Sequence, residues 1–156
     1  TQPQRGMQIV HVDLDLIRDA FQLRIALERE AVACFIKTGT DEEIAALIAT
    51  HQAILAEAKN GVTDDLIQRA QALDWMFHDA LIDRMNNQII SKIYRVNSIK
   101  IRLIRTERLR MDASLLEQVM NDHLLILEGI ARRDAETAIR ELERHIRNAL
   151  LRAFAP

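Results

Sequence analysis

Residues that break helices are scarce in this chain of 156 residues. Its two prolines, Pro3 and Pro156, stand close to the two ends, and the sequence has four glycines. A chain with so few breakers and little alternation of β-branched residues is typical of helical proteins. The scarcity therefore argues against a sheet-rich fold and favours an all-α one.

Disulfides, long apolar runs and a strong net charge are lacking as well. Cys34 is the one cysteine, so no disulfide can form within the chain, which fits a reducing compartment. No run approaches the roughly 20 apolar residues of a membrane span, and no charged-then-apolar leader opens the chain. We therefore expect a cytoplasmic protein with no membrane contact. The net charge of −2 gives no basic field, so this segment alone is not expected to bind nucleic acid.

Hydrophobic residues recur at helical spacing between capping residues and breakers, which predicts a series of helices. Thr40 with Glu43 has the pattern of a capping box, and Thr63 precedes a helix with acids in its first turn. Because the connections are short, consecutive helices should pack antiparallel. We predict an all-α fold, an antiparallel bundle of six helices, or seven if the fourth stretch breaks. The expected helices cover about residues 13–37, 41–60, 64–85, 88–110, 113–131 and 134–153.

Four polar residues fall on the inward faces of three of these helices. Asp74 and His78 lie one turn apart on the third helix, His123 lies on the fifth and His145 on the sixth. Any one histidine alone is more often a hydrogen-bonded core residue, and Asp74 could pair with a neighbouring base. Their convergence favours a metal site, since imidazole with carboxylate suits zinc, nickel, manganese or iron. Four such ligands would leave one or two positions open for water or a small acid.

Arg24 projects into the middle of the apolar face of the first helix, and Glu28 follows one turn later. Two interpretations remain open: an internal ion pair between them, or a guanidinium that faces a cavity and binds a carboxylate. Asn97 and Lys100 are weaker candidates for lining a polar pocket.

For three other features we expect an ordinary structural role. His51 is expected to be a packing or surface residue, and Trp75 a core or interface residue. The basic residues of the fourth helix are spread around it, which indicates a solvated or dimer-facing surface. They are Lys100, Arg102, Arg105, Arg108 and Arg110.

Several segments, in this order and spacing, are similar to one known family. FQLRIALEREAV resembles the R-x-x-L-E signature that opens the FCD effector domain of FadR-type GntR regulators. DWMFHDAL resembles the family's D-x-x-F-H-x-x-L segment. DHLLILEGIARRDAETA resembles E-H-x-x-I-x-x-A-I-x-x-G-D-x-x-x-A, and an RHI follows with its histidine 22 residues after His123. The chain departs from the pattern at Asp122, Gly129 and Arg133, where the family has glutamate, alanine and glycine.

The resemblance implies a helical bundle, usually dimeric, that binds a small metabolite and controls a DNA-binding domain. In metal-containing members one aspartate and three histidines hold the ion, which carries over to Asp74, His78, His123 and His145. It implies one divalent metal, zinc in first place with nickel, manganese or iron as alternatives. The effector would be a hydroxy acid, dicarboxylate or sugar acid that meets the metal and Arg24.

The resemblance also implies how the domains are organised. Residues 1–12 are expected to be a linker or disordered start, and residues 13–156 the ligand-binding domain of a homodimer. A winged helix-turn-helix would precede them, and DNA would be bound through it alone.

Two other classes of function remain as alternatives. A metalloenzyme could use the open metal positions to activate water, yet the sequence has no H-E-x-x-H and no Glu-x-x-His pair of the di-iron kind. A purely structural oligomerisation module would have a dry core without a metal. We expect a sensor and not an enzyme.

Overall fold

Six α-helices make up the computed structural model, which describes residues 12–108 and 110–155, without the side chains of residues 106–108. The described residues contain no strand, so the predicted all-α class is confirmed, and the fourth helix continues unbroken. Of the expected linker, residues 1–12, all but Val12 lie outside the described residues, and the Val12 side chain packs into the core. The helices are α1 (Leu14–Thr38), α2 (Asp41–Ala58), α3 (Asp64–Asp83), α4 (Gln88–Arg108), α5 (Ala113–Ala131) and α6 (Ala135–Phe154).

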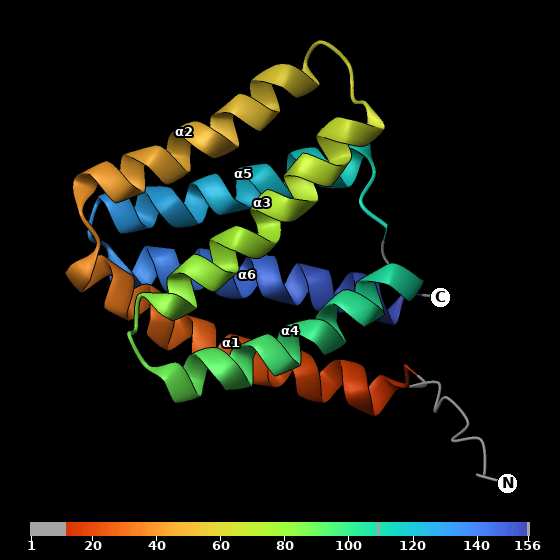
Figure 1. Cartoon of the computed structure of the whole chain (residues 1–156), viewed down its shortest axis with the longest axis horizontal. Coiled ribbons are helices and arrows are strands. Elements are labelled where there is room, and N and C mark those ends of the chain that lie inside the picture. The colour runs from red at the N-terminus through yellow and green to blue at the C-terminus, as the bar shows by residue number, and fades with distance from the viewer. Residues whose placement is uncertain (1–11, 109, 156) are drawn as a thin grey trace, which may run out of the picture.

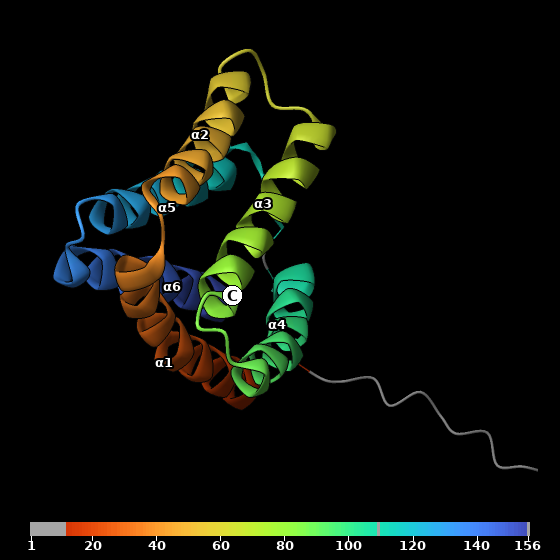
Figure 2. The same ribbon diagram turned by 60° about the vertical axis from the view of Figure 1, so that its left-hand side comes forward.

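The helices pack so that α5 lies against both α3 and α6. The antiparallel pair α5 and α6 is flanked by α2 on one side and α1 on the other, and α3 lies obliquely across them (Figure 1). Seen from the side, α4 packs against both α1 and α3 (Figure 2). No helix among the described residues is long and apolar enough to cross a membrane.

Side-chain caps fix where the helices that carry the site begin. Thr63, Asp112 and Asp134 each accept a hydrogen bond from the backbone N–H three residues on, at the starts of α3, α5 and α6. Thr40 and Glu43 form the expected capping box at the start of α2. Each such cap contributes about 1 kcal/mol and fixes the residue at which its helix begins.

The turn between α5 and α6 places these two helices unusually close. A Cβ built on Gly129 would lie 2.7 Å from the backbone nitrogen of Ala138, so glycine is required at this spacing. Arg133 has a φ of 57°, in the left-handed region where the family carries glycine. Its guanidinium donates to the carbonyl oxygens of Ile36 and Gly39, 2.8 Å each. Two of the departures noted in the sequence thus belong to one compact turn.

Candidate metal centre and adjoining pocket

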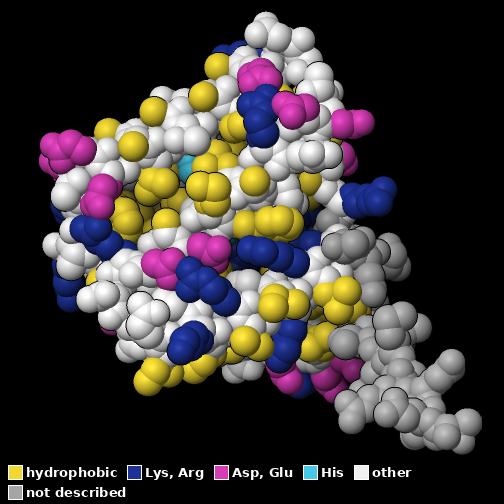
Figure 3. Space-filling view, in the orientation of Figure 1, with side chains coloured by type: hydrophobic (Ala, Val, Ile, Leu, Met, Phe, Trp, Pro, Cys, Tyr) yellow, Lys and Arg dark blue, Asp and Glu magenta, His cyan; other side chains and the backbone are white. Residues whose placement is uncertain are grey.

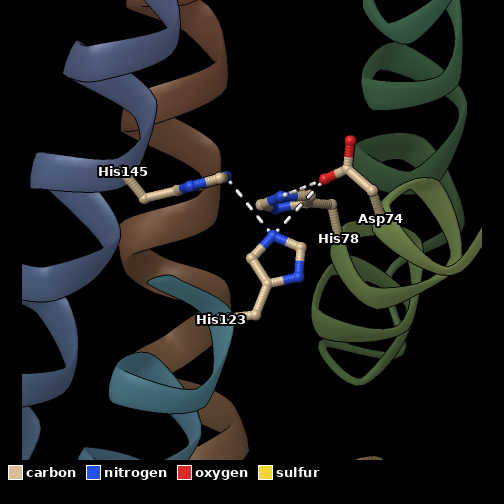
Figure 4. A group of neighbouring side chains, drawn as sticks. All are labelled: Asp74, His78, His123 and His145. Atoms are coloured by element: carbon tan, nitrogen blue, oxygen red, sulfur yellow. Dashed lines mark hydrogen bonds and ion pairs between the residues drawn. The ribbon is translucent and has the colours of Figure 1, made fainter. Parts of the chain in front are cut away.

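Four buried side chains meet at one point inside the bundle. Asp74 and His78 from α3, His123 from α5 and His145 from α6 point toward one another (Figure 4). One ligand atom from each of them lies within 4.8 Å of the corresponding atoms of the other three. A carboxylate and three imidazoles in this arrangement could hold a metal ion.

The shorter distances in this cluster match the spacing of ligands around a small cation. The Nε2 atom of His123 lies 3.3 Å from Nε2 of His145 and 3.3 Å from Oδ1 of Asp74. The same Oδ1 lies 3.4 Å from Nε2 of His78. Zinc–nitrogen bonds of about 2.0–2.1 Å put tetrahedral ligands about 3.3 Å apart. These three contacts therefore already have the spacing of metal ligands.

Two atoms at the centre of the cluster lack a hydrogen-bond partner, which tests whether the residues fit a cation. Asp74 Oδ1 and His78 Nε2 are buried and have no hydrogen-bond partner among the described residues. Leaving a buried polar atom unsatisfied costs about 1–3 kcal/mol, and more for a charged one. A cation bound between them would satisfy both atoms, so the residues present fit a metal.

A second histidine fixes the tautomer of His123. His51 is fully buried, and its Nδ1 lies 2.7 Å from the carbonyl oxygen of Leu47, which can only accept, so this nitrogen donates. In the neutral ring the other nitrogen, Nε2, then accepts from Nδ1 of His123 at 3.0 Å. This arrangement leaves a lone pair on His123 Nε2, directed at the cluster.

Two carboxylates orient the imidazoles of His78 and His145 in the same way as His51 orients that of His123. Nδ1 of His78 donates to Oε2 of Glu28 at 2.6 Å, and Nδ1 of His145 lies 3.3 Å from Oδ2 of Asp122. Because each Nδ1–H is directed outward, the neutral form of each ring would direct the lone pair of its Nε2 inward. Outer acceptors of this kind orient histidine ligands and raise their basicity in metal sites.

The second oxygen of Asp74 is held away from the centre. Arg105 forms an ion pair with Oδ2 and Gln71 donates to it at 3.2 Å, while Oδ1 faces the histidines. Burial alone would raise the pKa of Asp74, but the Arg105 guanidinium helps to hold it well below its usual value. Asp74 is therefore ionised and offers one oxygen to the centre.

The three imidazoles differ in their affinity for protons. Burial lowers the pKa of His123 well below its usual value and that of His145 to about 4. Burial acts on His78 too, but the negative charge of Glu28 outweighs it, and the pKa of His78 is raised. His123 and His145 are thus neutral near pH 7, the form in which imidazole binds a metal.

A narrow polar pocket adjoins the cluster on the side of α1 and α4. His78 borders it, with Arg24, Tyr94 and Asn97 among the other lining residues. Arg24 donates through Nε to Glu28 at 2.8 Å, and Tyr94 donates to the same oxygen at 2.6 Å. The internal ion pair between Arg24 and Glu28 is therefore present, and Arg24 also lines the pocket. The binding of a carboxylate by Arg24 stays a prediction.

Of the other residues considered in the sequence, some lie where they were expected and others do not. Asn97 lines the pocket and donates to the carbonyl oxygen of Ala20 at 2.8 Å, whereas Lys100 is exposed. Arg105 was expected on a solvated or dimer-facing surface, which is wrong: it lines the pocket and contacts Asp74. His51 is a buried residue and not a surface one. Its position on the inward face of α2 with Ile44 and Ile54 is the signal that indicates this.

Comparisons with known proteins agree on one family. The model of the FCD domain family matches residues 19–148. Among curated proteins, the HTH-type transcriptional regulator BphR of Paraburkholderia xenovorans (strain LB400), itself uncharacterised, is 26% identical over 156 residues. That match covers 96% of this chain and 62% of the relative, so the chain spans about three fifths of the relative's length.

The fold has a counterpart among solved structures. The metal-free FCD domain of TM0439, a candidate transcriptional regulator, superposes with a TM-score of 0.73 at 20% identity. The match covers 92% of this chain and 94% of that domain. At this identity the likeness concerns the fold alone.

Proposed function

Since the chain belongs to the FCD domain family, we propose that it is the effector-sensing domain of a GntR/FadR-type transcriptional regulator. In this proposal it binds one divalent metal and a small organic acid, and it thereby modulates DNA binding by a winged helix-turn-helix outside this sequence. The helix-turn-helix in the name of the BphR relative supports this organisation. The relatives are regulators by name, and we propose a cytoplasmic sensor without enzymatic activity.

The observation that carries the proposal is the pair of buried atoms without a hydrogen-bond partner, Asp74 Oδ1 and His78 Nε2, in a cluster of one carboxylate and three imidazoles whose ligand atoms lie within 4.8 Å of one another. Asp74, His78, His123 and His145 would hold the metal, with zinc as the first candidate and nickel, manganese or iron as alternatives. A bound divalent cation would supply positive charge and open coordination positions for a carboxylate oxygen. The protein residues bind it, orient its ligands and exclude water.

Metal content tests the ligand assignment directly. We expect the purified protein, reloaded with zinc, to hold one equivalent by elemental analysis, and the His123→Ala variant to hold less than a tenth of that. His11→Ala removes a histidine far from the cluster in the sequence and serves as the matched control. An unchanged zinc stoichiometry in His123→Ala would overturn the assignment.

The effector would enter the pocket beside His78. Arg24, buried and charged because Glu28 raises its pKa against the effect of burial, would bind the carboxylate, and the Oδ1 atom of Asn97 would accept from a hydroxyl group. A planar guanidinium binds a carboxylate with two parallel hydrogen bonds. The class that fits is a small hydroxy acid, dicarboxylate or sugar acid.

A thermal-shift screen of such acids on the zinc-loaded protein tests the pocket. A specific binder stabilises the folded state by about 2.7 kcal/mol when present at a hundred times its Kd. We expect Asn97→Ala to reduce the shift while the zinc stoichiometry stays at one. An acid that shifts the wild type and Asn97→Ala equally would contradict the assigned pocket.

Such a sensor would act as a homodimer, and the exposed face of α4 is the surface we propose for it. Ile89, Val96 and Ile99 are 72%, 58% and 67% exposed along this helix, and Figure 3 shows hydrophobic and basic side chains intermixed over it. We expect Val96→Glu to shift the protein toward the monomer in analytical ultracentrifugation. A ligand could alter DNA binding only through its different affinities for two arrangements of the dimer.

A further inference from the structure

One carboxylate at the border of the polar pocket accepts no hydrogen bond from the described residues. Asp79 follows His78 on α3, lines the pocket and keeps 29% of its side chain exposed. Its one ion-pair partner among the described residues is Arg102, whose Nη2 atom lies 3.9 Å from Oδ2 of Asp79. This distance is too long for a hydrogen bond, so Arg102 offsets the charge of Asp79 without occupying its lone pairs. The carboxylate oxygens of Asp79 are therefore acceptors that a ligand in the pocket can use.

On the inner wall of the pocket, the donor groups of two residues are already used within the protein. Tyr94 donates to Glu28 at 2.6 Å, and Nδ2 of Asn97 donates to a backbone carbonyl of α1 at 2.8 Å. The Oδ1 atom of Asn97 accepts no hydrogen bond from the described residues. Arg24 bonds to Glu28 through Nε, which leaves its two terminal nitrogens for a ligand. The pocket thus offers a guanidinium for one carboxylate and, with Asp79, two acceptors for donor groups.

A hydroxyl is the ligand group that suits the surroundings of Asp79. It both donates and accepts hydrogen bonds, whereas a carboxylate at neutral pH only accepts and an ammonium group only donates. Trp75 lines the same pocket, and its Nε1 is buried and has no hydrogen-bond partner among the described residues. A hydroxyl group can accept from such a nitrogen and donate to a carboxylate. An ammonium group beside Asp79 would in addition meet the positive charge of Arg102.

On the basis of the proposed function, we propose that Asp79 determines the specificity of the pocket. It accepts a hydrogen bond from a hydroxyl group of an acid whose carboxylate lies at Arg24. The effector class then narrows to a hydroxy acid or a sugar acid, and dicarboxylates are rejected. A second carboxylate would leave the lone pairs of Asp79 without a donor and add a like charge beside it, and such unpaired charges are a common means of excluding a wrong ligand.

Two series of acids of matched length test this specificity on the zinc-loaded protein. Propionate, lactate, alanine and malonate share three carbons, and hexanoate, gluconate and adipate share six. Trp75 is the one tryptophan of the chain, so its emission reports on the pocket without a label, and calorimetry gives the affinities. In at least one series we expect the hydroxy acid to bind at least about tenfold more tightly than the plain acid and the dicarboxylate, a difference of about 1.4 kcal/mol.

Two variants of α3 separate Asp79 from the metal, which a hydroxyl group could also reach. Asp79→Asn keeps the size of the side chain and supplies an amide donor, so we expect the dicarboxylate to bind at least about tenfold more tightly than it binds the wild type. Misfolding cannot produce such a gain. Asp83→Asn removes a negative charge one turn later, where the carboxylate pairs with Arg95 outside the pocket, and should leave both series unchanged. Both variants should keep one equivalent of zinc.

The outcomes distinguish the role of Asp79 from the acid sensor itself. A dicarboxylate that binds the wild type as tightly as the hydroxy acid would overturn the role of Asp79, and so would alanine that binds more tightly than lactate. An unchanged ratio of hydroxy-acid to dicarboxylate affinity in Asp79→Asn would overturn it as well, because the preference would then come from the metal. If no acid in either series bound or altered the emission, the sensing proposal would fail too.

Discussion

The α5–α6 half and the α3 half of the candidate centre bring their ligands together in different ways. His123 and His145 come from two helices that approach closely because Gly129 leaves room for the backbone of Ala138. Asp74 and His78 lie one turn apart on a single helix. Their outer atoms are held by hydrogen bonds and ion pairs to residues of α1 and α4. The α5–α6 half thus combines close backbone packing with hydrogen bonds to His51 and Asp122, whereas the α3 half depends on a polar network that reaches α1 and α4.

The difference bears on where a ligand could act. Close packing of backbones offers no group that a small molecule can displace. The polar network is different, because Arg24, Tyr94 and Arg105 contact Glu28 or Asp74 and also line the pocket. An effector would therefore change the α3 half while the α5–α6 half stays constant. The following substitutions and conditions test this contrast.

The largest effect on the free energy of unfolding is expected when the polar network loses the carboxylate of Glu28. Glu28→Ala would leave Arg24 and the Nδ1 of His78 without their acceptor in a fully buried site. Removing one partner of a buried ion pair costs about 3–5 kcal/mol. Urea unfolding of the metal-free protein measures this cost. Glu30→Ala, an exposed acid on the same helix, is the control, and equal losses in both variants would refute the network.

Lowering the pH of the metal-free protein should act on the two halves with opposite sign. An unfolded histidine takes up a proton near pH 6.5, while His145 in the folded protein stays neutral down to about pH 4. The unfolded state then binds more protons between these values, so stability falls by about 1.4 kcal/mol per pH unit for each such group. His123, whose pKa is also lowered, adds to this loss.

The raised pKa of His78 has the reverse effect. Its contribution is fully present below about pH 6.5 and is lost as the pH rises through the folded-state value. His145→Gln should therefore flatten the decline in unfolding free energy between pH 6.5 and 4. His78→Gln should leave that window unchanged and should instead remove the loss of stability that accompanies a rise in pH above 6.5. Urea titrations at five pH values would show this, and parallel changes in the two variants would contradict the contrast.

A moderate effect is expected from filling the close contact in the packed half. In Gly129→Ala the new methyl group would meet the Ala138 nitrogen at 2.7 Å and its Cα at 2.8 Å. Overpacking of this kind costs about 1–3 kcal/mol, although alanine favours a helix by about 1 kcal/mol over glycine. We expect a net loss of stability by thermal unfolding, together with weaker zinc binding. A gain in stability in Gly129→Ala would show that α5 and α6 can move apart to admit the methyl group, and it would contradict the close contact.

The smallest effect is expected at the turn itself. Arg133→Gly would relieve a left-handed residue, worth about 1–2 kcal/mol, but would remove the hydrogen bonds to Ile36 and Gly39 and the ion pair with Asp41. These terms oppose each other, so we expect a change below about 1 kcal/mol in the unfolding free energy. A loss above about 2 kcal/mol in the unfolding free energy would mean that Arg133, and not the contact of Gly129 with Ala138, stabilises the packing of α5 against α6.

The parts of this arrangement that sequence could predict are those encoded locally. Helix bounds followed from capping residues such as Thr40 and Thr63 and agree with the structure to within about two residues. The inward positions of His123 and Asp74 followed from helical periodicity. The partners of these groups could not be predicted in this way. His51 meets His123 across 72 positions, and Arg105 meets Asp74 across 31. Such contacts depend on how the helices pack and not on the pattern within either helix.

Because α1 is long, a small tilt of the helix at Glu28 produces a larger displacement at its amino end. Glu28 accepts a hydrogen bond from His78 near the middle of α1, which begins at Leu14. The helical rise from Leu14 to Glu28 is about 21 Å. A tilt of about 5° around Glu28 would displace the amino end of this rod by about 2 Å. A small tilt of α1 at Glu28 could therefore leave the helix packing intact and still move the residues before Leu14 by about 2 Å.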